Sequence, residues 1–234
     1  MAAAIISGEN IVKYYGEEKI LDIEEVVIEE GLVLALMGPN GSGKSTLIKI
    51  LSQLEECKQS KIYFQGELVT AKNRLAVRRK IGFIWQDPLL YNTSVYENIA
   101  LSLKFRDLSE EKINTKVGEA LTRLNINKLA NKNAKQLSGG EKQKVSIART
   151  LVAEPELIFI DEPNTSLDID SINLVEEIIA EEVEKGVSVL VVTHNFYQAK
   201  SLADEVLVLK EGRLVDQDRP ENLSIKEEGL LKYI

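Results

Sequence analysis

The sequence predicts an α/β fold, in which a mostly parallel sheet is flanked by helices. Uninterrupted apolar runs at residues 32–37 and 157–160, and a largely apolar run at 187–193, read as strands that are buried on both faces. The first two runs are followed by residues with helical periodicity, at 47–51 and 172–183. Strands that alternate with helices in this way are typical of a parallel sheet covered on both sides.

The remaining strand signals predict an N-terminal antiparallel β subdomain and a final hairpin. Residues 5–28 alternate apolar and polar positions around Gly16, which is typical of two short strands joined by a turn. Residues 61–68 read as a further strand pair, and residues 205–215 as a hairpin that turns at 211–212.

The middle of the chain predicts an inserted helical subdomain over residues 87–150. Ser109 is followed by two glutamates, as at the start of a helix, and apolar residues then recur at spacings of three and four. Residues 1–86 and 151–234 would form the core of this single domain, which also carries the β subdomain.

The composition narrows the class of function. A net charge of −8 and a pI near 5.0 argue against a general nucleic-acid binder, which needs a basic surface. The single cysteine, Cys57, excludes an intrachain disulfide and a cysteine-rich metal site, and favours a reducing cytoplasm. No apolar run reaches the roughly 18 residues of a membrane span, so any membrane role is expected to be peripheral.

A Gly-rich stretch follows the first apolar run and precedes a helix. Its glycines let backbone N–H groups approach phosphate oxygens at the positive end of that helix. Lys44 would reach the outer phosphates, and the Ser45 hydroxyl would bind the accompanying Mg²⁺. An ordinary surface turn is the alternative, but strand, spacing and helix are all present. The residues expected to hold the triphosphate are Gly38, Pro39, Asn40, Gly41, Ser42, Gly43, Lys44, Ser45 and Thr46.

Polar side chains follow the ends of other predicted strands. Gln86 follows a run at residues 80–85, and His194, the only histidine, follows the run that ends at residue 193. Asp161 and Glu162 end another run. Ligands of open parallel sheets collect beyond the carboxyl ends of the strands, so we expect one site here. Asp161 would hold Mg²⁺ and Glu162 would polarise the attacking water, although two surface carboxylates before a turn are the alternative.

Over nearly all its length the chain resembles the ATP-binding subunit of an ABC transporter. The motifs that carry the resemblance occur in the order of that family: residues 38–46, Gln86, Leu-Ser-Gly-Gly-Glu at 137–141, Phe-Ile-Asp-Glu-Pro at 159–163, Ser-Leu-Asp at 166–168, and His194. The resemblance implies a P-loop NTPase fold with a RecA-like core, ATP and Mg²⁺ as cofactors, and ATP hydrolysis coupled to transmembrane transport. Trp85, Asn164 and Thr165 depart from the commonest pattern without removing a catalytic group.

The resemblance also implies roles for individual residues. His194 would bind the γ-phosphate, and Gln86 would sense the γ-phosphate, Mg²⁺ and the attacking water. Tyr15, with Tyr14 as the alternative, would stack on adenine, although an aromatic ring at a strand end is more often a cross-strand partner. The predicted catalytic residues are Glu162, His194 and Gln86, and the predicted metal ligands are Ser45, Gln86 and Asp161.

A head-to-tail homodimer is implied for the ATP-bound state. A whole subdomain separates Lys44 from Ser138, Gly139 and Gly140 in the chain. The family places this helix start on the ATP that the other subunit holds, which uses the anion-binding end of a helix. Asp168 is implied to cross the same interface.

Partners at the cytoplasmic face of the cell membrane are implied as well. The segment from Asp87 to Arg106 resembles the surface that receives a coupling helix of a transmembrane permease subunit, although part of it would also be subdomain core. A basic cluster at residues 74–80 reads as a solvated helix face unless it meets an acidic partner or lipid headgroups. A solute-binding protein is expected in the full complex, and nucleic acid is not.

The function that this resemblance favours is solute import, and small importer ATPases of the tungstate or molybdate oxyanion type are the most similar. The alternative is an ABC-type ATPase without a transporter. Translation factors of that kind carry two cassettes and DNA-repair relatives carry long insertions, and this sequence has neither. A cell-division or macromolecule-remodelling ATPase is an alternative that the motifs do not exclude.

Overall fold

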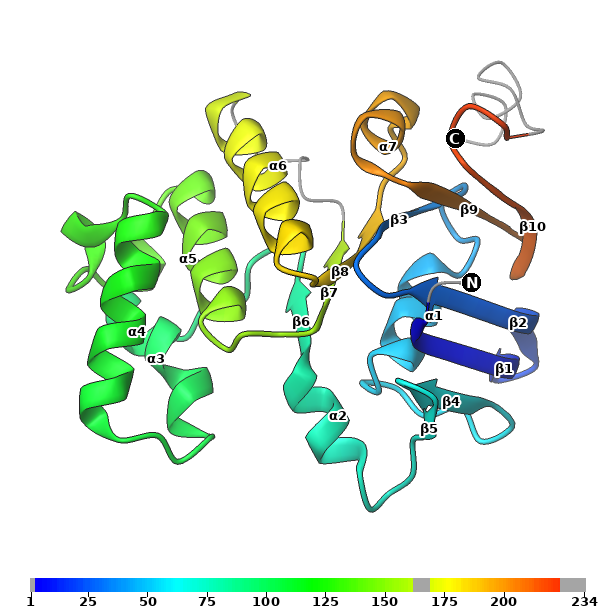
Figure 1. The fold of residues 1–234 in the computed structure, drawn as a ribbon, viewed down its shortest axis with the longest axis horizontal. Coiled ribbons are helices and arrows are strands. Elements are labelled where there is room, and N and C mark those ends of the chain that lie inside the picture. Colours follow the sequence, from blue (N-terminus) through cyan, green and yellow to red (C-terminus); the bar gives the residue numbers. More distant parts are fainter. Residues whose placement is uncertain (1–2, 162–168, 224–234) are drawn as a thin grey trace.

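The computed structural model describes residues 3–161 and 169–223, which form two sheets with helices around them (Figure 1). The strands of the larger sheet are β3 (Val33–Met37), β6 (Ile81–Ile84), β7 (Leu157–Asp161), β8 (Ser188–Val192), β9 (Glu205–Lys210) and β10 (Arg213–Asp218). They lie in the order β10-β9-β3-β8-β7-β6. Among these described strands, neighbours from β9 to β6 are parallel, and β10 runs antiparallel to β9. The predicted mostly parallel sheet is confirmed.

The smaller sheet is antiparallel and lies at the N-terminal end of the chain. Its strands are β1 (Ala4–Tyr15), β2 (Glu18–Glu29), β4 (Lys61–Phe64) and β5 (Glu67–Leu68), in the order β2-β1-β4-β5. The expectation of two short N-terminal strands is wrong in length, because β1 and β2 have 12 residues each. Two register shifts, at Ala4/Ile6 and Lys13/Tyr14, let the pair continue through local irregularities.

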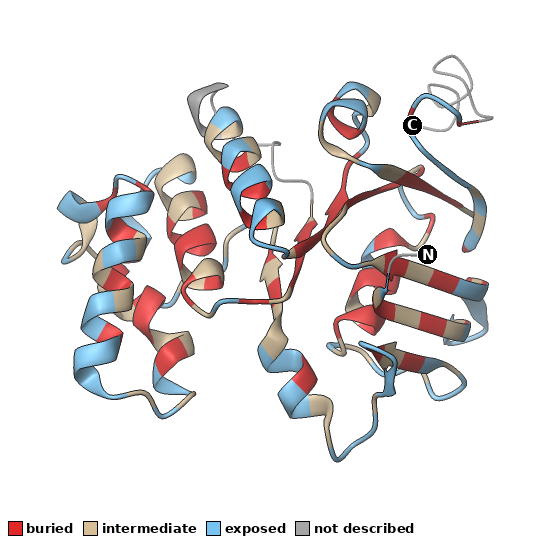
Figure 2. Cartoon of the chain, viewed as in Figure 1, coloured by how far each residue is buried: buried red, intermediate tan, exposed pale blue. Residues whose placement is uncertain are grey.

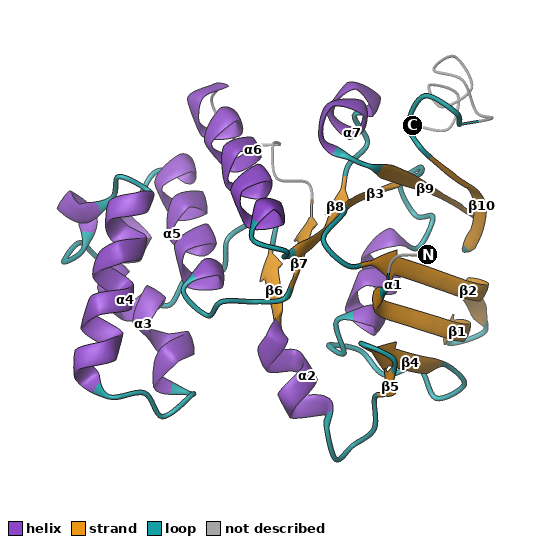
Figure 3. Cartoon of the chain, viewed as in Figure 1, coloured by secondary structure: helices purple, strands orange, loops and turns teal. Residues whose placement is uncertain are grey.

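Helices make up most of the rest of the described chain (Figure 3). The α-helices are α1 (Lys44–Leu51), α2 (Arg74–Lys80), α3 (Val95–Lys104), α4 (Glu110–Arg123), α5 (Gly139–Leu151), α6 (Ile169–Glu184) and α7 (Phe196–Leu202). The short 3₁₀ helices are η1 (Asn127–Leu129) and η2 (Ala134–Gln136). Lys80 ends α2 and does not begin the next strand, as the sequence pattern had suggested. Among the described residues, no helix combines the length and the apolar character needed to cross a membrane.

Helices α3, α4 and α5 pack together at the end of the molecule opposite the smaller sheet (Figure 1). Helix α4 begins after Ser109, as predicted, and the Ser109 side chain accepts a hydrogen bond from the Lys112 N–H. Its predicted apolar stripe contributes Ile113, Val117 and Leu121 to the core. These contacts support the proposal that residues 87–150 form a helical subdomain.

Alternate side chains of the central strands fill separate cores on the two faces of the sheet. The central strands are drawn largely in red in Figure 2, which marks buried residues. In β7, Leu157 and Phe159 pack with α1 and the smaller sheet, whereas Ile158 and Ile160 pack with α5 and α6. This alternation follows from the two-residue period of a strand. Because both faces are covered, the carboxyl ends of the strands are left as the place where a ligand can approach.

Candidate functional site

The loop between β3 and α1 starts at a position where only glycine fits. Gly38 has a φ of 145°, and a Cβ built on it would lie 2.0 Å from the carbonyl oxygen of Leu209 in β9. Any side chain at this position would therefore push the loop away from the sheet.

Lys44 begins α1 and keeps only 7% of its surface exposed. Its Nζ donates hydrogen bonds to the carbonyl oxygens of Gly38, at 2.7 Å, and Pro39, at 3.0 Å. The side chain thus lies back across the loop. Its positive charge is placed where an anion bound by the loop would meet it.

A cavity of about 610 Å³ lies beside this loop, at the carboxyl ends of β6, β7 and β8. That volume is within the usual range of small-molecule sites. The predicted residues that line it are Tyr15, Asn40, Gly41, Gly43, Lys44, Ser45, Thr46, Gln86 and Asp161. The other lining residues are Glu18, Ile20 and Val192, which the sequence analysis missed. Glu18 and Ile20 alternate on β2 next to Tyr15, and that alternation is the signal that could have identified them.

The other predicted site residues are placed elsewhere. Gly38, Pro39 and Ser42 belong to the same loop without lining the cavity, and His194 follows β8 two residues beyond Val192. Ser138 is the N-cap of α5, and Gly139 and Gly140 are its first residues, away from the described cavity lining. Glu162 and Asp168 lie outside the described residues.

The cavity lining fits a nucleotide triphosphate with Mg²⁺. The Ser45 hydroxyl, the Gln86 amide and the Asp161 carboxylate offer the oxygen ligands that Mg²⁺ prefers. Lys44 and the loop N–H groups at the start of α1 offer positive charge to phosphate. The groups that suit Mg²⁺ and the groups that suit phosphate therefore line the same cavity.

Tyr15 lines this cavity, whereas Tyr14 is not among the described lining residues. Exposure does not separate the two rings, because 48% of Tyr15 and 47% of Tyr14 are accessible. As neighbours on β1 they project to different sides of the strand. The cavity therefore favours Tyr15 over Tyr14 as the partner of a base.

His194 lies in a turn that its neighbours hold in place. The Thr193 hydroxyl donates to the side-chain oxygen of Gln198 at 2.8 Å and accepts from the Asn195 N–H at 3.0 Å. The Asn195 side chain caps α7 by accepting from the N–H groups of Tyr197 and Gln198. Helix α7 was not among the elements expected from the sequence, although Asn195 is the start signal that could have revealed it.

The start of α5 is a complete capping box. The Ser138 hydroxyl accepts from the Glu141 N–H at 3.3 Å, and the Glu141 carboxylate accepts from the Ser138 N–H at 2.7 Å. The hydrogen bond from the Ser138 backbone lowers the pKa of the Glu141 carboxyl. Glu141 therefore stays ionised near neutral pH and holds this helix start in one conformation.

Comparison with known proteins identifies the family. The family described as "ABC transporter" matches residues 21–165. The tungstate uptake system ATP-binding protein TupC of Peptoclostridium acidaminophilum is 34% identical over 214 residues, which are 91% of this chain and 98% of TupC. The glucose import ATP-binding protein GlcV of Saccharolobus solfataricus is 35% identical over 92% of this chain, which spans only 63% of GlcV.

Solved structures agree with the sequence relatives. CbiO1 of Clostridium perfringens, described as part of the ABC transporter complex CbiONQ, has a TM-score of 0.85 at 29% identity, over 98% of this chain and 94% of that chain. The ATP-binding cassette MJ0796, a dimer in a post-hydrolysis state bound to ADP and phosphate, has a TM-score of 0.83 at 30% identity, over 92% and 98%. The predicted P-loop NTPase fold is confirmed. Because the family match covers more than half of the chain and these relatives agree with it, the chain belongs to the ABC transporter family, as an ATP-binding subunit that hydrolyses ATP.

Proposed function

We propose that this protein powers solute import by hydrolysing Mg²⁺-bound ATP in the cavity beside residues 38–46. The observation that carries the proposal is that one cavity gathers Lys44, Ser45, Gln86 and Asp161 from separate segments of the chain. Lys44 and the loop N–H groups would bind the outer phosphates, and the three oxygen-bearing side chains would hold Mg²⁺. The metal ion, when bound, neutralises charge on the phosphates.

Hydrolysis also needs a water molecule aimed at the γ-phosphate. Glu162 is assigned to polarise that water because it follows Asp161 directly, and this assignment rests on the sequence. His194 would donate a hydrogen bond to the γ-phosphate from a turn that Thr193 and Asn195 hold rigid. Gln86 would link the metal ion to the segment that follows β6.

The ATP-bound form is proposed to be a head-to-tail homodimer. The capped start of α5, with Ser138, Gly139 and Gly140, would contact ATP held by the other copy, and Asp168 would cross the interface. The dimeric state of the MJ0796 relative supports this arrangement.

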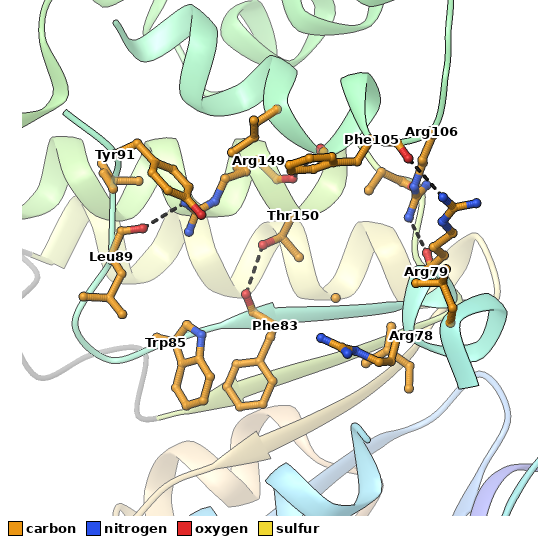
Figure 4. A pocket seen from close by; sticks show the side chains of 17 residues that line it. Arg78, Arg79, Phe83, Trp85, Leu89, Tyr91, Phe105, Arg106, Arg149 and Thr150 are labelled. Carbon is orange, nitrogen blue, oxygen red and sulfur yellow. Dashed lines mark hydrogen bonds between the residues drawn. The ribbon is translucent and has the colours of Figure 1, made fainter. Parts of the chain in front are cut away.

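A groove of about 900 Å³ supports the docking of a membrane permease subunit (Figure 4). The rings of Phe83 and Trp85 form one wall, stacked 3.8 Å apart between centroids. The segment between residues 87 and 106 contributes Leu89, which is 75% exposed, and Phe105, which is 70% exposed, to the lining of the groove. Such exposed apolar side chains around a groove suit an amphipathic helix of a partner.

Arginines make this groove positive as well as apolar. Arg79 donates to the Phe105 carbonyl at 3.0 Å, and Arg149 donates to the Leu89 carbonyl at 2.8 Å (Figure 4). Arg106 donates to the carbonyls of Ala153 and Arg79. Burial lowers the pKa of both Arg106 and Arg149, yet a guanidinium stays protonated at neutral pH. The proposed coupling helix therefore carries a carboxylate beside its apolar residues.

The sequence pattern suggested that the basic cluster at residues 74–80 forms one solvated helix face, but the structure divides the cluster. Arg78 and Arg79 line the groove, whereas Arg74 pairs with Glu56 and Lys80 with Glu156. The cluster is split because successive residues of α2 point in different directions around the helix.

For the solute, the similarity to TupC, which is named for tungstate uptake, supports tungstate or a related oxyanion. A solute-binding protein is proposed as a further member of the full complex. The similarity to GlcV names glucose as a competing solute. The proposed location is the cytoplasmic face of the membrane. A non-transport ATPase is the second candidate, since the same ATP chemistry serves both.

ATP hydrolysis is the first test. Wild-type protein should release phosphate from Mg²⁺-ATP, and Lys44→Ala should lower kcat/KM by about tenfold or more through weaker nucleotide binding. Lys49→Ala, on the same helix but outside the described cavity lining, is the control and should keep wild-type activity. Equal ATP affinity of wild type and Lys44→Ala would overturn the assignment of Lys44.

Transport is tested in the source cells. Tagged Glu162→Gln protein, isolated with ATP from detergent-solubilised native membranes, should bring a multi-span permease with it. Leu89→Asp in the same background should lose the permease while it still binds ATP. Recovery of division or ribosomal proteins would favour the second candidate, and unchanged oxyanion uptake after gene deletion would refute the proposed solute.

A further inference from the structure

We infer that Glu55 is a positioning residue that holds the Tyr15 ring in place beside the nucleotide cavity. The inference rests on the proposed function, in which Tyr15 stacks on the adenine of ATP. Glu55 lies in the loop after α1, 40 residues from Tyr15 in the chain, and belongs to none of the motifs described above.

The contact between the two side chains is direct. The Tyr15 hydroxyl lies 2.9 Å from Oε1 and 2.8 Å from Oε2 of Glu55, so it donates to a carboxylate that faces it with both oxygens. A charged acceptor makes this a stronger hydrogen bond than a neutral one. Because the hydroxyl is anchored, the ring at the end of β1 is restrained in the orientation that lines the cavity.

Lys13 completes the network. Its Nζ lies 2.5 Å from Oε1 of Glu55, donates to the Glu56 carbonyl at 2.9 Å, and sits 5.4 Å from the centre of the Tyr15 ring. The side chains of Lys13 and Glu55 are only 17% and 22% exposed, which distinguishes them from a mobile surface pair. Burial disfavours the charge on Glu55, but the hydrogen bonds from Lys13 and Tyr15 outweigh it and lower the pKa of this carboxyl. The acceptor is therefore ionised at neutral pH.

The backbone ties Glu55 to the helix that starts at the phosphate-binding loop. The N–H groups of Leu54 and Glu55 both donate to the Lys49 carbonyl, at 2.8 and 3.0 Å. Lys49 lies in the last turn of α1, and Lys44 begins the same helix. A short rigid helix thus separates the phosphate end of the site from the residue that holds the ring. This fixed spacing favours a ligand that carries both a triphosphate and a base.

Two ligands separate base binding from phosphate binding. Mg²⁺-ATP carries both groups, whereas Mg²⁺-tripolyphosphate carries only the phosphates, and each is titrated by calorimetry into wild-type and variant protein. Glu55→Ala and Tyr15→Phe each remove the same hydrogen bond. Either change should raise the Kd for ATP about three- to tenfold and leave the Kd for tripolyphosphate unchanged. The double variant should be no weaker than the single ones, because both remove one interaction.

The chain offers a matched control and a rescue. Glu56→Ala removes the neighbouring carboxylate, which pairs with Arg74 and not with Tyr15, and should keep wild-type affinity for both ligands. Glu55→Gln keeps an acceptor oxygen and should restore most of the ATP affinity. In steady-state hydrolysis, Glu55→Ala should raise KM for ATP with little change in kcat, because the chemistry takes place at the phosphates.

Distinct outcomes separate this inference from the proposed function. If Glu55→Ala binds ATP as tightly as Glu56→Ala, or weakens ATP and tripolyphosphate equally, Glu55 does not position the ring. If Glu55→Ala fails to fold, Tyr15→Phe decides the question, since it keeps the ring and loses only the hydroxyl. Wild-type protein that does not bind Mg²⁺-ATP would overturn the proposed function itself.

Discussion

Gly38 shows how one residue links the phosphate-binding loop to the sheet behind it. Gly38→Ala should lower the free energy of unfolding by about 1–3 kcal/mol, because the φ of 145° and the Leu209 carbonyl leave no room for a Cβ. Displacement of the loop should also raise the Kd for ATP by about tenfold or more. Urea unfolding and calorimetric titration measure the two effects.

Gly118 provides the control for that substitution. It lies within α4, and a Cβ built on it would meet no described heavy atom within 4 Å beyond its own helix. Gly118→Ala should leave ATP affinity unchanged and stabilise the protein by about 0.5–1 kcal/mol, as expected in a helix interior. Equal losses of stability and of ATP affinity in Gly38→Ala and Gly118→Ala would contradict the role of close packing at Gly38.

At the scale of the elements, one buried amide holds the segment that precedes α3. The Asn98 side chain donates to the carbonyls of Tyr91, at 3.1 Å, and Ser94, at 3.0 Å, and accepts from the Tyr91 N–H at 2.8 Å. Asn98→Ala should lower the free energy of unfolding by about 2–3 kcal/mol, because these main-chain groups lose their partner inside the protein. Urea denaturation measures the loss. As a control, Asn114→Ala on the exposed side of α4 should change the free energy of unfolding by less than about 1 kcal/mol.

A charged cluster joins α4 to α6 and should make their packing depend on pH. Arg123 donates to Glu182 at 2.7 Å, and Lys185 donates to it at 2.8 Å. Burial disfavours the charge on Glu182, but the hydrogen bonds from Lys185 and Arg123 outweigh it and lower the pKa of this carboxyl below its ordinary 4.5. The stabilisation is therefore complete above pH 4.5 and is lost as the pH falls through the folded-state pKa.

The pH dependence can be measured with one substitution and one control. At pH about 7, Glu182→Gln should lower the free energy of unfolding by about 1–3 kcal/mol, and the difference from wild type should shrink at pH about 4 and below. Glu177→Gln, an exposed position of the same helix, should show no such difference. If the free energies of unfolding of Glu182→Gln and wild type differ by the same amount at every pH, this linkage is excluded.

At the scale of the whole molecule, the capped start of α5 and the cavity beside Lys44 are separate surfaces of one chain. A second copy is the simplest way to bring both to one ATP. Glu162→Gln, which should bind ATP without hydrolysing it, is expected to elute with ATP at twice the 26.1 kDa monomer mass. Multi-angle light scattering measures the mass. Glu162→Gln combined with Lys44→Ala should remain monomeric, and a monomer in both cases would speak against the dimer.

Prediction from the sequence succeeded where the signal is local or strongly periodic. The central strand β3 is apolar throughout, and α4 starts after a serine followed by two glutamates, so both were found. It failed where the signal is short or weak. Helix α7 has only seven residues. Glu55 contacts Tyr15 across 40 residues of the chain, and no local sequence pattern predicts that contact.

The sequence alone was enough to place the strand, loop and helix around residues 38–46, and it predicted the side chains that are proposed to carry the chemistry. Those features depend on backbone preferences and on contacts within a few residues. The folded structure was needed to show that β3 lies between β8 and β9, and that Tyr15, Gln86 and Asp161 share a cavity with Lys44. These neighbours come from distant parts of the chain, and the packing of the whole sheet brings them together.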